Sequence, residues 1–320
     1  MDKIALFGAT GAIGSSIAAE LRARGQGYRV VARNRRDLES KFGSDPRAEI
    51  AIWNPDDPQS VREAARGIDT IFYLVGVPYW EFQLHPVLMK KTLDGAIAEA
   101  VQRLVLIGTV YPFGRPRTER IREDHPREPQ TFKGRMRKEQ EDLVMSADAA
   151  GSIHGTVLRL PDFYGPNMER SFLASAFQAA VTGGRAQMVG PLDVPHEFIF
   201  VPDVGPIAVA LASNPGAFER TWNMAGPGTI TQRQFVERIF QQAGSKPRMI
   251  AANKFMLRIL GLGNPLLREV VEMYYLFETP VLMDDTAIGD LLGNVRKTSY
   301  DEGIRSTLST MRSDQSTAAV

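Results

Sequence analysis

The first half of the chain alternates short apolar runs with longer segments of helical pattern, and this alternation constrains the fold more than any other feature. Each run is about five to seven residues long, and the segments between the runs are long enough for crossover helices. Strands buried on both faces of a parallel sheet are typically continuous apolar runs. The runs are KIALFGA, YRVVAR, AEIAIW, DTIFYLVG, RLVLIGT and HGTVLRL. The sequence therefore predicts an α/β fold with a doubly wound parallel sheet.

Length and composition limit the partners of the chain. Its 320 residues can bury a full core as one large unit or as two modest domains. The 38 cations nearly balance the 37 acids, so we expect no nucleic acid, no membrane and instead a small molecule as the partner. The absence of cysteine excludes disulfides, thiolate metal sites and cysteine nucleophiles, and it fits a reducing compartment. Because the N-terminus lacks a signal-peptide pattern and no apolar stretch is long enough to span a bilayer, we expect a cytoplasmic protein.

A glycine-rich turn, GATGAIG, directly follows the first apolar run and opens a helical pattern. Glycines spaced three apart let the backbone turn tightly, approach a pyrophosphate and pack the helix on the strand. The first amides of the helix then face the anion. A glycine trio alone is weak evidence, but in this position of a βαβ unit it predicts a dinucleotide site. The residues expected at the cofactor are Gly8, Thr10, Gly11, Ala12, Ile13 and Gly14.

The ends of the next three apolar runs carry further candidate contacts to the dinucleotide. Arg33 ends the second run, where a ribose 2′-hydroxyl calls for a carboxylate and a 2′-phosphate calls for an arginine. We therefore favour NADP(H) over NAD(H), and a merely solvated arginine is the alternative interpretation. Asn54 follows the third run and is a candidate hydrogen-bond partner of the adenine. Val75 and Gly76 end the fourth run, where a glycine lets the cofactor pass closely.

With these motifs the chain resembles the extended short-chain dehydrogenase/reductase family, in its NAD-dependent epimerase/dehydratase group. The resemblance extends over almost the whole chain, and although single motifs are loose, their ordered set is specific. The landmarks are GATGAIG, WNPDDPQSV with GIDTIFYLVG, RLVLIGTVYPFG, RLPDFYGP, HEFIFVPDVGPIAVAL and TWNMAGPGTITQRQF. The resemblance implies a Rossmann-type NAD(P) domain, a smaller substrate domain and hydride transfer at a carbinol or carbonyl carbon. Since dimers are common in such proteins, we also consider a homodimer.

The domain boundary is expected near residue 166, where irregular segments rich in glycine and proline begin. We assign residues 1–165 to the NAD(P)-binding domain and residues 166–312 mainly to the substrate-binding domain. The run HEFIFVPD predicts a strand that can return to the sheet, so residues of about 197–211 are assigned to the first domain. Residues 313–320 are small and polar and are expected to form a flexible tail.

Two helix starts carry the capping-box pattern. Ser60 with Glu63 forms one box, and Thr231 with Gln234 forms the other. Gly244 is the expected stop of the second helix.

The same resemblance implies a catalytic set from which this chain departs. Family members end the fifth strand in a serine or threonine, which is Thr109 here, and carry Tyr-x-x-x-Lys on a following helix. In this chain the helix reads KGRMRKEQE, so Lys133 and Arg137 take those positions. The other register, Phe132 and Met136, has neither function, and no Tyr-x-x-x-Lys occurs elsewhere. We expect Thr109 to orient the reacting oxygen, Lys133 to supply a proton or a positive charge, and Arg137 to hold the cofactor ribose.

A lysine does not replace a phenol directly. With a reference pKa of about 10.4 it is an ammonium that can polarise a carbonyl, and it is a poor base unless its surroundings depress that pKa. Asp162, in RLPDFYGP, is a candidate carboxylate partner for Lys133, and its negative charge would raise the pKa of the lysine rather than depress it. Tyr111 lies two residues after Thr109 and is a candidate for the missing phenol. Packing beneath the turn is the more common role of such a tyrosine.

Asp162 and His196 are candidate substrate contacts. They stand where similar nucleotide-sugar enzymes carry an asparagine and a diphosphate-binding arginine. Because a carboxylate repels a pyrophosphate, we do not expect a nucleotide-diphosphate sugar as substrate. His196 can hydrogen-bond a smaller substrate, and a structural role is the alternative. The histidines have no metal-ligand spacing, so we expect no metal.

The sequence contains neither a nucleophile elbow nor a Walker A lysine, so it does not support a hydrolase or an NTPase. The first hypothesis is an NADP(H)-dependent oxidoreductase or epimerase acting on a small carbonyl or hydroxyl compound. The second is a catalytically weak NADP(H)-binding sensor or regulatory protein, which the loss of the phenol motivates. We favour the enzyme, because a pure binder does not need a charged lysine beside the hydride path, where an unpaired buried ammonium is costly.

Overall fold

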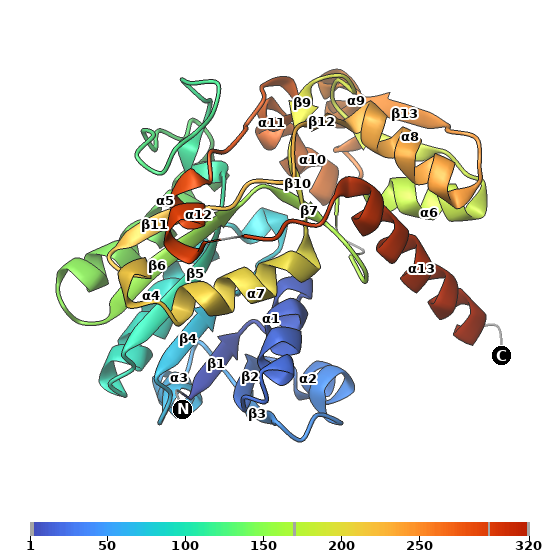
Figure 1. The fold of residues 1–320 in the computed structure, drawn as a ribbon. Coiled ribbons are helices and arrows are strands. Elements are labelled where there is room, and N and C mark those ends of the chain that lie inside the picture. Colours follow the sequence, from blue (N-terminus) through green and yellow to red (C-terminus); the bar gives the residue numbers. More distant parts are fainter. Residues whose placement is uncertain (1–2, 169–170, 294, 319–320) are drawn as a thin grey trace.

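A central parallel sheet organises the larger part of the molecule in the computed structural model, which describes residues 3–168, 171–293 and 295–318 (Figure 1). Its strands are β1 (Ile4–Phe7), β2 (Tyr28–Ala32), β3 (Ala48–Ile52), β4 (Thr70–Tyr73), β5 (Arg103–Thr109), β6 (His154–Leu160) and β11 (Arg220–Asn223). The order is β11-β6-β5-β4-β1-β2-β3, and every neighbouring pair is parallel. The six apolar runs form β1 to β6, so the predicted α/β class with a doubly wound sheet is confirmed.

Helices cover both faces of this sheet because successive strand residues point to opposite sides. Ile4 and Leu6 of β1 belong to one hydrophobic cluster, whereas Ala5 and Phe7 belong to another. Helices α1 and α7 pack against each other over the first face, and α3, α4 and α5 follow one another over the second. Their bounds are α1 (Ala12–Ala23), α2 (Arg35–Phe42), α3 (Pro58–Ala65), α4 (Leu84–Ala98), α5 (Phe132–Ala149) and α7 (Val201–Ala212).

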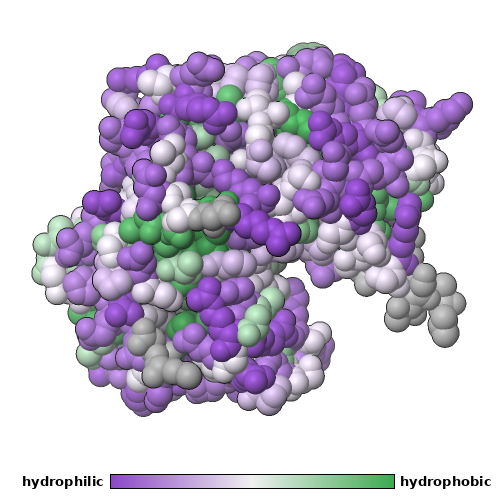
Figure 2. Space-filling model, in the orientation of Figure 1, coloured by the Kyte–Doolittle hydropathy of each residue, from purple (hydrophilic) through white to green (hydrophobic). Residues whose placement is uncertain are grey.

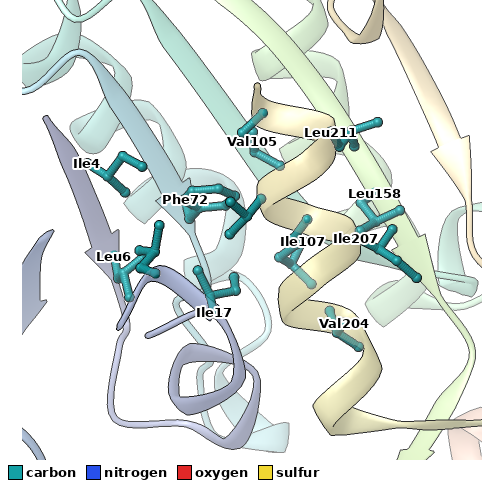
Figure 3. Packing of buried hydrophobic residues seen from close by; sticks show 14 of the residues in the cluster. Ile4, Leu6, Ile17, Phe72, Val105, Ile107, Leu158, Val204, Ile207 and Leu211 are labelled. Atoms are coloured by element: carbon teal, nitrogen blue, oxygen red, sulfur yellow. The ribbon is translucent and has the colours of Figure 1, made fainter. Parts of the chain in front are cut away.

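Figure 3 shows how α7 is held to the sheet. Val204, Ile207 and Leu211 point from the helix toward β5 and β6, where Ile107 and Leu158 meet them. All five side chains are buried, and burial of each stabilises the fold by about 1.5–3 kcal/mol. Helix α7 is therefore part of the hydrophobic core on this face of the sheet.

The smaller part of the molecule lies at the upper right of Figure 1, and its described residues form three two-stranded sheets. Its strands are β7 (Asp162–Tyr164) with β10 (Phe198–Phe200), β9 (Pro195–His196) with β12 (Ile230–Thr231), and β8 (Ala186–Val189) with β13 (Met249–Ala252). Its helices are α6 (Ala174–Thr182), α8 (Gln232–Ala243), α9 (Lys254–Leu260), α10 (Pro265–Met273), α11 (Tyr275–Glu278) and α13 (Tyr300–Ala318). Helix α12 (Thr286–Leu292) and the short 3-10 turns η1 (Tyr79–Glu81), η2 (Tyr111–Phe113) and η3 (Pro215–Ala217) complete the described elements.

One prediction about the second half was wrong. The run HEFIFVPD forms β10, which pairs with β7 in a separate sheet, and the strand that joins the main sheet is β11, in the segment TWN. The segment that returns to the first domain is helix α7. Its apolar residues are buried against the sheet, as Figure 3 shows. The predicted tail is helical through Ala318, because α13 continues from its buried Ile304 and Leu308; residues 319–320 lie outside the described residues.

The two capping predictions had different outcomes. Thr231 and Gln234 form the complete capping box of α8, and Gly244 ends that helix with φ of 75°. Ser60 does not cap α3; Asp57 does, and its side chain accepts a hydrogen bond from the backbone of Gln59. Pro58 explains the earlier start, since proline is favoured at the first helical position.

No helix among the described residues is long and apolar enough to cross a membrane.

Candidate active site

The GATGAIG turn joins β1 to α1 and leaves an open space at its centre. Gly8 has φ of +88°, and a Cβ there would lie 2.8 Å from the backbone nitrogen of Val75; at Gly14 a Cβ would lie 2.2 Å from the carbonyl oxygen of Ala9. Packing therefore requires glycine at both positions. At Gly11 the nearest atom to a Cβ would be 3.9 Å away, and a Cβ at Gly76 meets nothing within 4 Å. The turn is thus tightly packed at Gly8 and Gly14 and open at Gly11, and the chain after β4 is also open at Gly76.

This open space suits the phosphates of a dinucleotide. Gly11 is the N-cap of α1 and makes no side-chain capping bond, and the first turn of the helix holds no acidic residue. The amides that begin α1, from Ala12 to Gly14, can therefore bind an anion without competition from an acidic side chain. Thr10 is fixed from behind, because Lys41 Nζ donates to its carbonyl oxygen at 2.5 Å. Sequence reasoning did not find Lys41, which lies on α2.

The remaining expected cofactor residues lie along the same edge of the sheet. Arg33 follows β2, is exposed and has no side-chain partner among the described residues, so its guanidinium is available to a ligand. Asn54 follows β3, but its Oδ1 accepts a hydrogen bond from the amide of Asp56 at 3.1 Å. The side-chain oxygen of Asn54 is thus engaged in the turn before α3, and its side-chain amide nitrogen is the group left to contact a cofactor. Val75 is half-buried and Gly76 is exposed after β4.

Thr109 ends β5 and lies beside a pair of hydrogen-bonded tyrosines. Its Oγ1 accepts a hydrogen bond of 3.4 Å from the backbone of Tyr111. The hydroxyl of Tyr111 in turn contacts the hydroxyl of Tyr79 at 2.6 Å, and Phe82 stacks on the Tyr111 ring at 6.3 Å between centroids. Tyr111 therefore takes part in a polar contact and is more than packing beneath the turn. Tyr79, in the segment VPYWEF after β4, was missed because nothing in its local pattern distinguishes it.

Asp162 begins β7, close enough to this pair of phenols for its charge to affect their pKa. Burial raises the pKa of Asp162 to about 6. Burial also raises the pKa of Tyr79 and Tyr111, and the Asp162 carboxylate raises both further. Both phenols are consequently protonated at neutral pH, and Asp162 is the titratable group of this set whose pKa lies nearest to neutrality.

Lys133 is held by carboxylates of the smaller part of the molecule. Its Nζ donates to Glu269 Oε2 at 2.5 Å and to Glu272 Oε2 at 2.7 Å, and the side chain is only 1% exposed. Both glutamates lie on α10, and neither was singled out from the sequence. The expectation that Asp162 is the carboxylate partner of Lys133 was therefore wrong, because α10 docks against the start of α5 and brings two closer carboxylates.

The start of α5 is fixed by the same contact. Thr131 caps the helix by accepting from the amide of Gly134 at 3.1 Å. Glu272 Oε1 accepts from the amides of Phe132 and Lys133, two of the groups that a helix start leaves without intrahelical partners. The Nζ of Lys133 also lies 5.4 Å from the centre of the Tyr79 ring. Lys133 therefore connects α5, α10 and the phenol pair.

Arg137 lies one turn further along α5, in the interior. Its Nη1 donates to Gln140 Oε1 at 2.7 Å and contacts His85 Nδ1 at 3.2 Å, while its Nη2 donates to the Ile107 carbonyl at 3.1 Å. Burial and then the Arg137 charge lower the pKa of His85 to about 2, so this imidazole is neutral and can accept. Three of the five N–H groups of Arg137 are engaged within the protein.

Glu141, the glutamate that follows on α5, anchors the helix to the sheet. It accepts from Arg159 of β6 at 2.9 Å, and both side chains are almost fully buried. Arg127 adds a second cation at 3.2 Å from Glu141. This ionic network keeps α5 in register with β6, so Lys133 and Arg137 approach the end of β5 from a fixed direction.

His196 is buried in β9 and takes no part in these ionic contacts. Its Nε2 has no hydrogen-bond partner among the described residues, and burial lowers its pKa to about 4, so the ring is neutral at neutral pH. Its ring lies near the rings of Phe198 and Phe277. Phe198 stands opposite Asp162 in the β7–β10 register, which places His196 two residues from that position.

Comparison with known proteins agrees with this geometry. The sequence model of the NAD dependent epimerase/dehydratase family matches residues 4–225. A dTDP-6-deoxy-L-talose 4-dehydrogenase (NAD(P)(+)) from Kitasatospora kifunensis is 27% identical over 256 residues, which cover 76% of this chain and 79% of that protein.

Solved structures show the same fold at low identity. A dTDP-glucose 4,6-dehydratase from Bacillus anthracis in complex with NAD has a TM-score of 0.83 and 13% identity, covering 99% of this chain and 98% of that one. A UDP-glucuronic acid 4-epimerase from Bacillus cereus in complex with NAD has a TM-score of 0.80 and 15% identity, covering 97% and 99%.

A doubly wound sheet with an open glycine turn at the end of its first strand defines the class of NAD(P)-binding α/β proteins. Within that class, the chain belongs to the NAD-dependent epimerase/dehydratase family of extended short-chain dehydrogenases/reductases. It is therefore an enzyme of the NAD(P)-dependent oxidoreductase and epimerase type.

Proposed function

We propose that this enzyme uses NADP(H) and acts as an oxidoreductase or epimerase on a hydroxyl or carbonyl group of a small substrate. The observation that carries the proposal is the position of Thr109, Tyr111 and Asp162 at the carboxyl ends of neighbouring strands, on the edge that also holds the open glycine turn. When bound, the nicotinamide supplies or accepts the hydride. The residues of the chain bind the cofactor, orient the substrate oxygen and move its proton.

The open turn at Gly11, the first amides of α1 and the space beside Gly76 fit a dinucleotide. Arg33 supports the phosphorylated form of the cofactor, since an exposed guanidinium without a partner among the described residues can bind a 2′-phosphate with two parallel hydrogen bonds. Arg137 keeps two N–H groups that can bind ribose hydroxyls.

In the proposed mechanism, Thr109 Oγ1 hydrogen-bonds the reacting oxygen and Tyr111 exchanges the proton with it. Tyr79 holds the Tyr111 hydroxyl at 2.6 Å. Because burial and Asp162 both raise the phenol pKa, Tyr111 is protonated at neutral pH. It therefore carries the proton that carbonyl reduction needs and is not available as a base. Asp162, with a pKa of about 6, can relay the proton that restores the phenol.

Lys133 has a different part in this proposal from the one expected from the sequence. Two of its three N–H groups already donate to Glu269 and Glu272, and these carboxylates offset its charge. It is therefore less suited than Tyr111 to protonate a substrate. We assign it the positioning of Tyr79 and of the start of α5.

The nature of the substrate follows from Asp162 and His196. A partly buried carboxylate beside the reacting centre disfavours a pyrophosphate, while neutral His196 can hydrogen-bond a substrate hydroxyl. The relative from Kitasatospora acts on a nucleotide sugar, so such sugars form the competing substrate class.

The test begins with calorimetric titration of NADP⁺ and NAD⁺ and continues with NADPH oxidation across small ketones, aldehydes and nucleotide keto-sugars. Tyr111→Phe should lower turnover by about 10²–10⁴-fold, the usual value of a positioned proton donor, with little change in cofactor affinity. Tyr275→Phe is the matched control, because Tyr275 is a buried tyrosine nearby that has no assigned role. Tight cofactor binding without turnover on any substrate would favour the sensor hypothesis, and no affinity for either cofactor would refute both.

A further inference from the structure

One segment of the smaller part holds most of the exposed large hydrophobic residues in the described part of the chain. Of the eleven exposed large hydrophobic residues in the described part of the chain, seven lie between residues 250 and 266. Single exposed apolar residues are ordinary, whereas their concentration in one segment marks an interaction surface. The seven are Ile250, Phe255, Met256, Ile259, Leu260, Leu262 and Leu266.

The fold holds this surface outward. Leu257 of α9 is 1% exposed and packs in a cluster with Val270, Tyr274 and Phe277, which fixes the helix to α10 and α11. The residues around it point away from that cluster: Phe255 is 69% exposed and Leu262, in the loop after α9, is 89% exposed. Figure 2 shows hydrophobic surface near the top of the molecule, between the positions of α11 and α9. The protein's own core thus uses one residue of α9 and leaves the others uncovered.

The segment also differs from the rest of the chain in its balance of positive and negative residues. Residues 244–268 contain five cations and no acid, whereas the whole chain has 38 cations and 37 acids. The cations are Lys246, Arg248, Lys254, Arg258 and Arg268. Lys246, Arg248 and Arg258 are exposed and have no side-chain partner among the described residues. The near-neutral charge of the whole chain therefore conceals a local excess of positive charge around the apolar residues.

We propose that residues 244–268 form a docking surface for an anionic lipid bilayer. Apolar side chains that protrude from a short helix and its loop can enter the boundary between headgroups and acyl chains, and flanking lysines and arginines are attracted to anionic headgroups. Lying on a bilayer does not need a spanning helix, so the finding that no described helix can cross a membrane does not bear on it.

The charge pattern decides between a bilayer and a second copy of the chain. A two-fold dimer through this surface would bring the five cations of one copy toward the same five of the other, with no acid in the segment to pair with them. An anionic bilayer satisfies both the apolar residues and the cations. Helix α10 begins within the segment and carries Glu269 and Glu272, so docking would bring the contact that holds Lys133 close to the lipid surface.

The test is co-sedimentation of the full chain with vesicles of phosphatidylcholine alone and of an equimolar mixture of phosphatidylcholine and phosphatidylglycerol. We expect binding to the mixed vesicles at low salt and at least about tenfold weaker binding to the neutral ones. The variant with Phe255→Ser, Ile259→Ser and Leu262→Ser should lose binding to both. All three residues are exposed, so the variant should keep its thermal unfolding midpoint.

The control variant combines Val87→Ser and Ile97→Ser, which removes two exposed apolar residues of α4 and should leave vesicle binding unchanged. The cations are tested with Lys246→Gln, Arg248→Gln and Arg258→Gln together, which should remove the preference for mixed vesicles. The proposal is overturned if the unaltered chain binds neither kind of vesicle at low salt, or if the triple serine variant binds as well as the control. It is also overturned if the chain forms a dimer that the triple serine variant abolishes while vesicle binding persists. Failure of the proposed function would not affect these results, because the assay measures no turnover.

Discussion

The contact of Lys133 with Glu269 and Glu272 can be tested by replacing Lys133 with methionine. Methionine keeps an unbranched stem of similar length beside the rings of Tyr79 and Phe82, but it removes both ion pairs. Two carboxylates would then face each other, and the only remaining cation beside them among the described residues is the exposed Arg268, 3.7 Å from Glu269 Oε1. Lys133→Met should therefore destabilise the folded protein through lost pairing and through repulsion between the glutamates.

The expected magnitude depends on how much water reaches the glutamates. Removal of one member of a fully buried ion pair costs about 3–5 kcal/mol. The ammonium is 1% exposed, but the side chains of Glu269 and Glu272 are 24% and 28% exposed and can be partly resolvated. We expect a loss of about 2–3 kcal/mol in the free energy of unfolding, at or just below the lower end of that range. Urea unfolding at neutral pH measures this quantity.

Lys138→Met is the matched control. Lys138 lies on the same helix and pairs with Asp142 at 2.6 Å, but its side chain is 36% exposed and that of Asp142 is 38% exposed. Such a surface pair contributes about 0.3–0.5 kcal/mol. If Lys133→Met and Lys138→Met destabilise the protein equally, the buried ion contact does not stabilise α10 against α5 and the reasoning is refuted.

A triple variant separates positioning from chemistry. Lys133→Met combined with Glu269→Gln and Glu272→Gln removes all three charges, and replacement of a whole buried ionic group is often nearly neutral in stability. After Glu272→Gln, the side-chain amide would still offer an oxygen to the backbone N–H groups at positions 132 and 133. If Lys133 only positions its neighbours, the triple variant should recover most of both stability and turnover. Recovery of stability without turnover would instead show that the ammonium acts on the substrate.

Three further predictions concern the cofactor turn and Asp162. Gly11→Ala should change the free energy of unfolding by less than about 1 kcal/mol, because a Cβ there meets no close neighbour. The new methyl group fills the open space, so NADP⁺ binding should weaken at least about tenfold in a calorimeter. Gly14→Ala should instead lower the urea midpoint, because its Cβ clashes with Ala9. Arg33→Ser should weaken NADP⁺ binding about tenfold and leave NAD⁺ binding unchanged; equal loss for both would exclude a contact to the 2′-phosphate. Asp162 has a pKa of about 6 in the folded protein, above its ordinary 3.8. Between these two values the folded protein holds a proton that the unfolded chain has lost. The free energy of unfolding therefore decreases as pH rises from about 4 to 6. Asp162→Asn should remove that decrease, on the order of 3 kcal/mol, and an unchanged pH profile of urea unfolding would contradict it.

The features predicted well from the sequence are those that depend on neighbouring residues. The six short apolar runs of the first half became buried strands, and the glycine turn after the first strand needs positive φ or close backbone approach, as Gly8 and Gly14 show. The capping box at Thr231 was found for the same reason, since donor and acceptor are three residues apart. The wrong prediction at Ser60 arose from a local competition, in which Asp57 followed by proline starts the helix earlier.

The site was only partly predictable because its contacts join distant residues. Thr109 and Lys133 were proposed from their places in an ordered pattern, but the partners of Lys133 lie 136 and 139 residues further along. Tyr79 lies 32 residues from the phenol it contacts, and no periodic pattern connects them. The composition of the segment 244–268 is likewise visible in the sequence but its exposure is not, since a helix with the same apolar content could equally have been buried.

By itself, the sequence determined the order of strands and helices in the first half, the glycine turn that suits a dinucleotide and the loss of the usual catalytic tyrosine. Only the tertiary structure decided which carboxylates neutralise Lys133, which phenol meets Tyr111 and which residues of α9 remain outside the core. The physical reason is that strand and turn formation depend on steric and burial preferences within a few residues. Ion pairing and burial depend instead on how two separately formed parts of the chain dock, and at that contact α10 brings its glutamates to the start of α5.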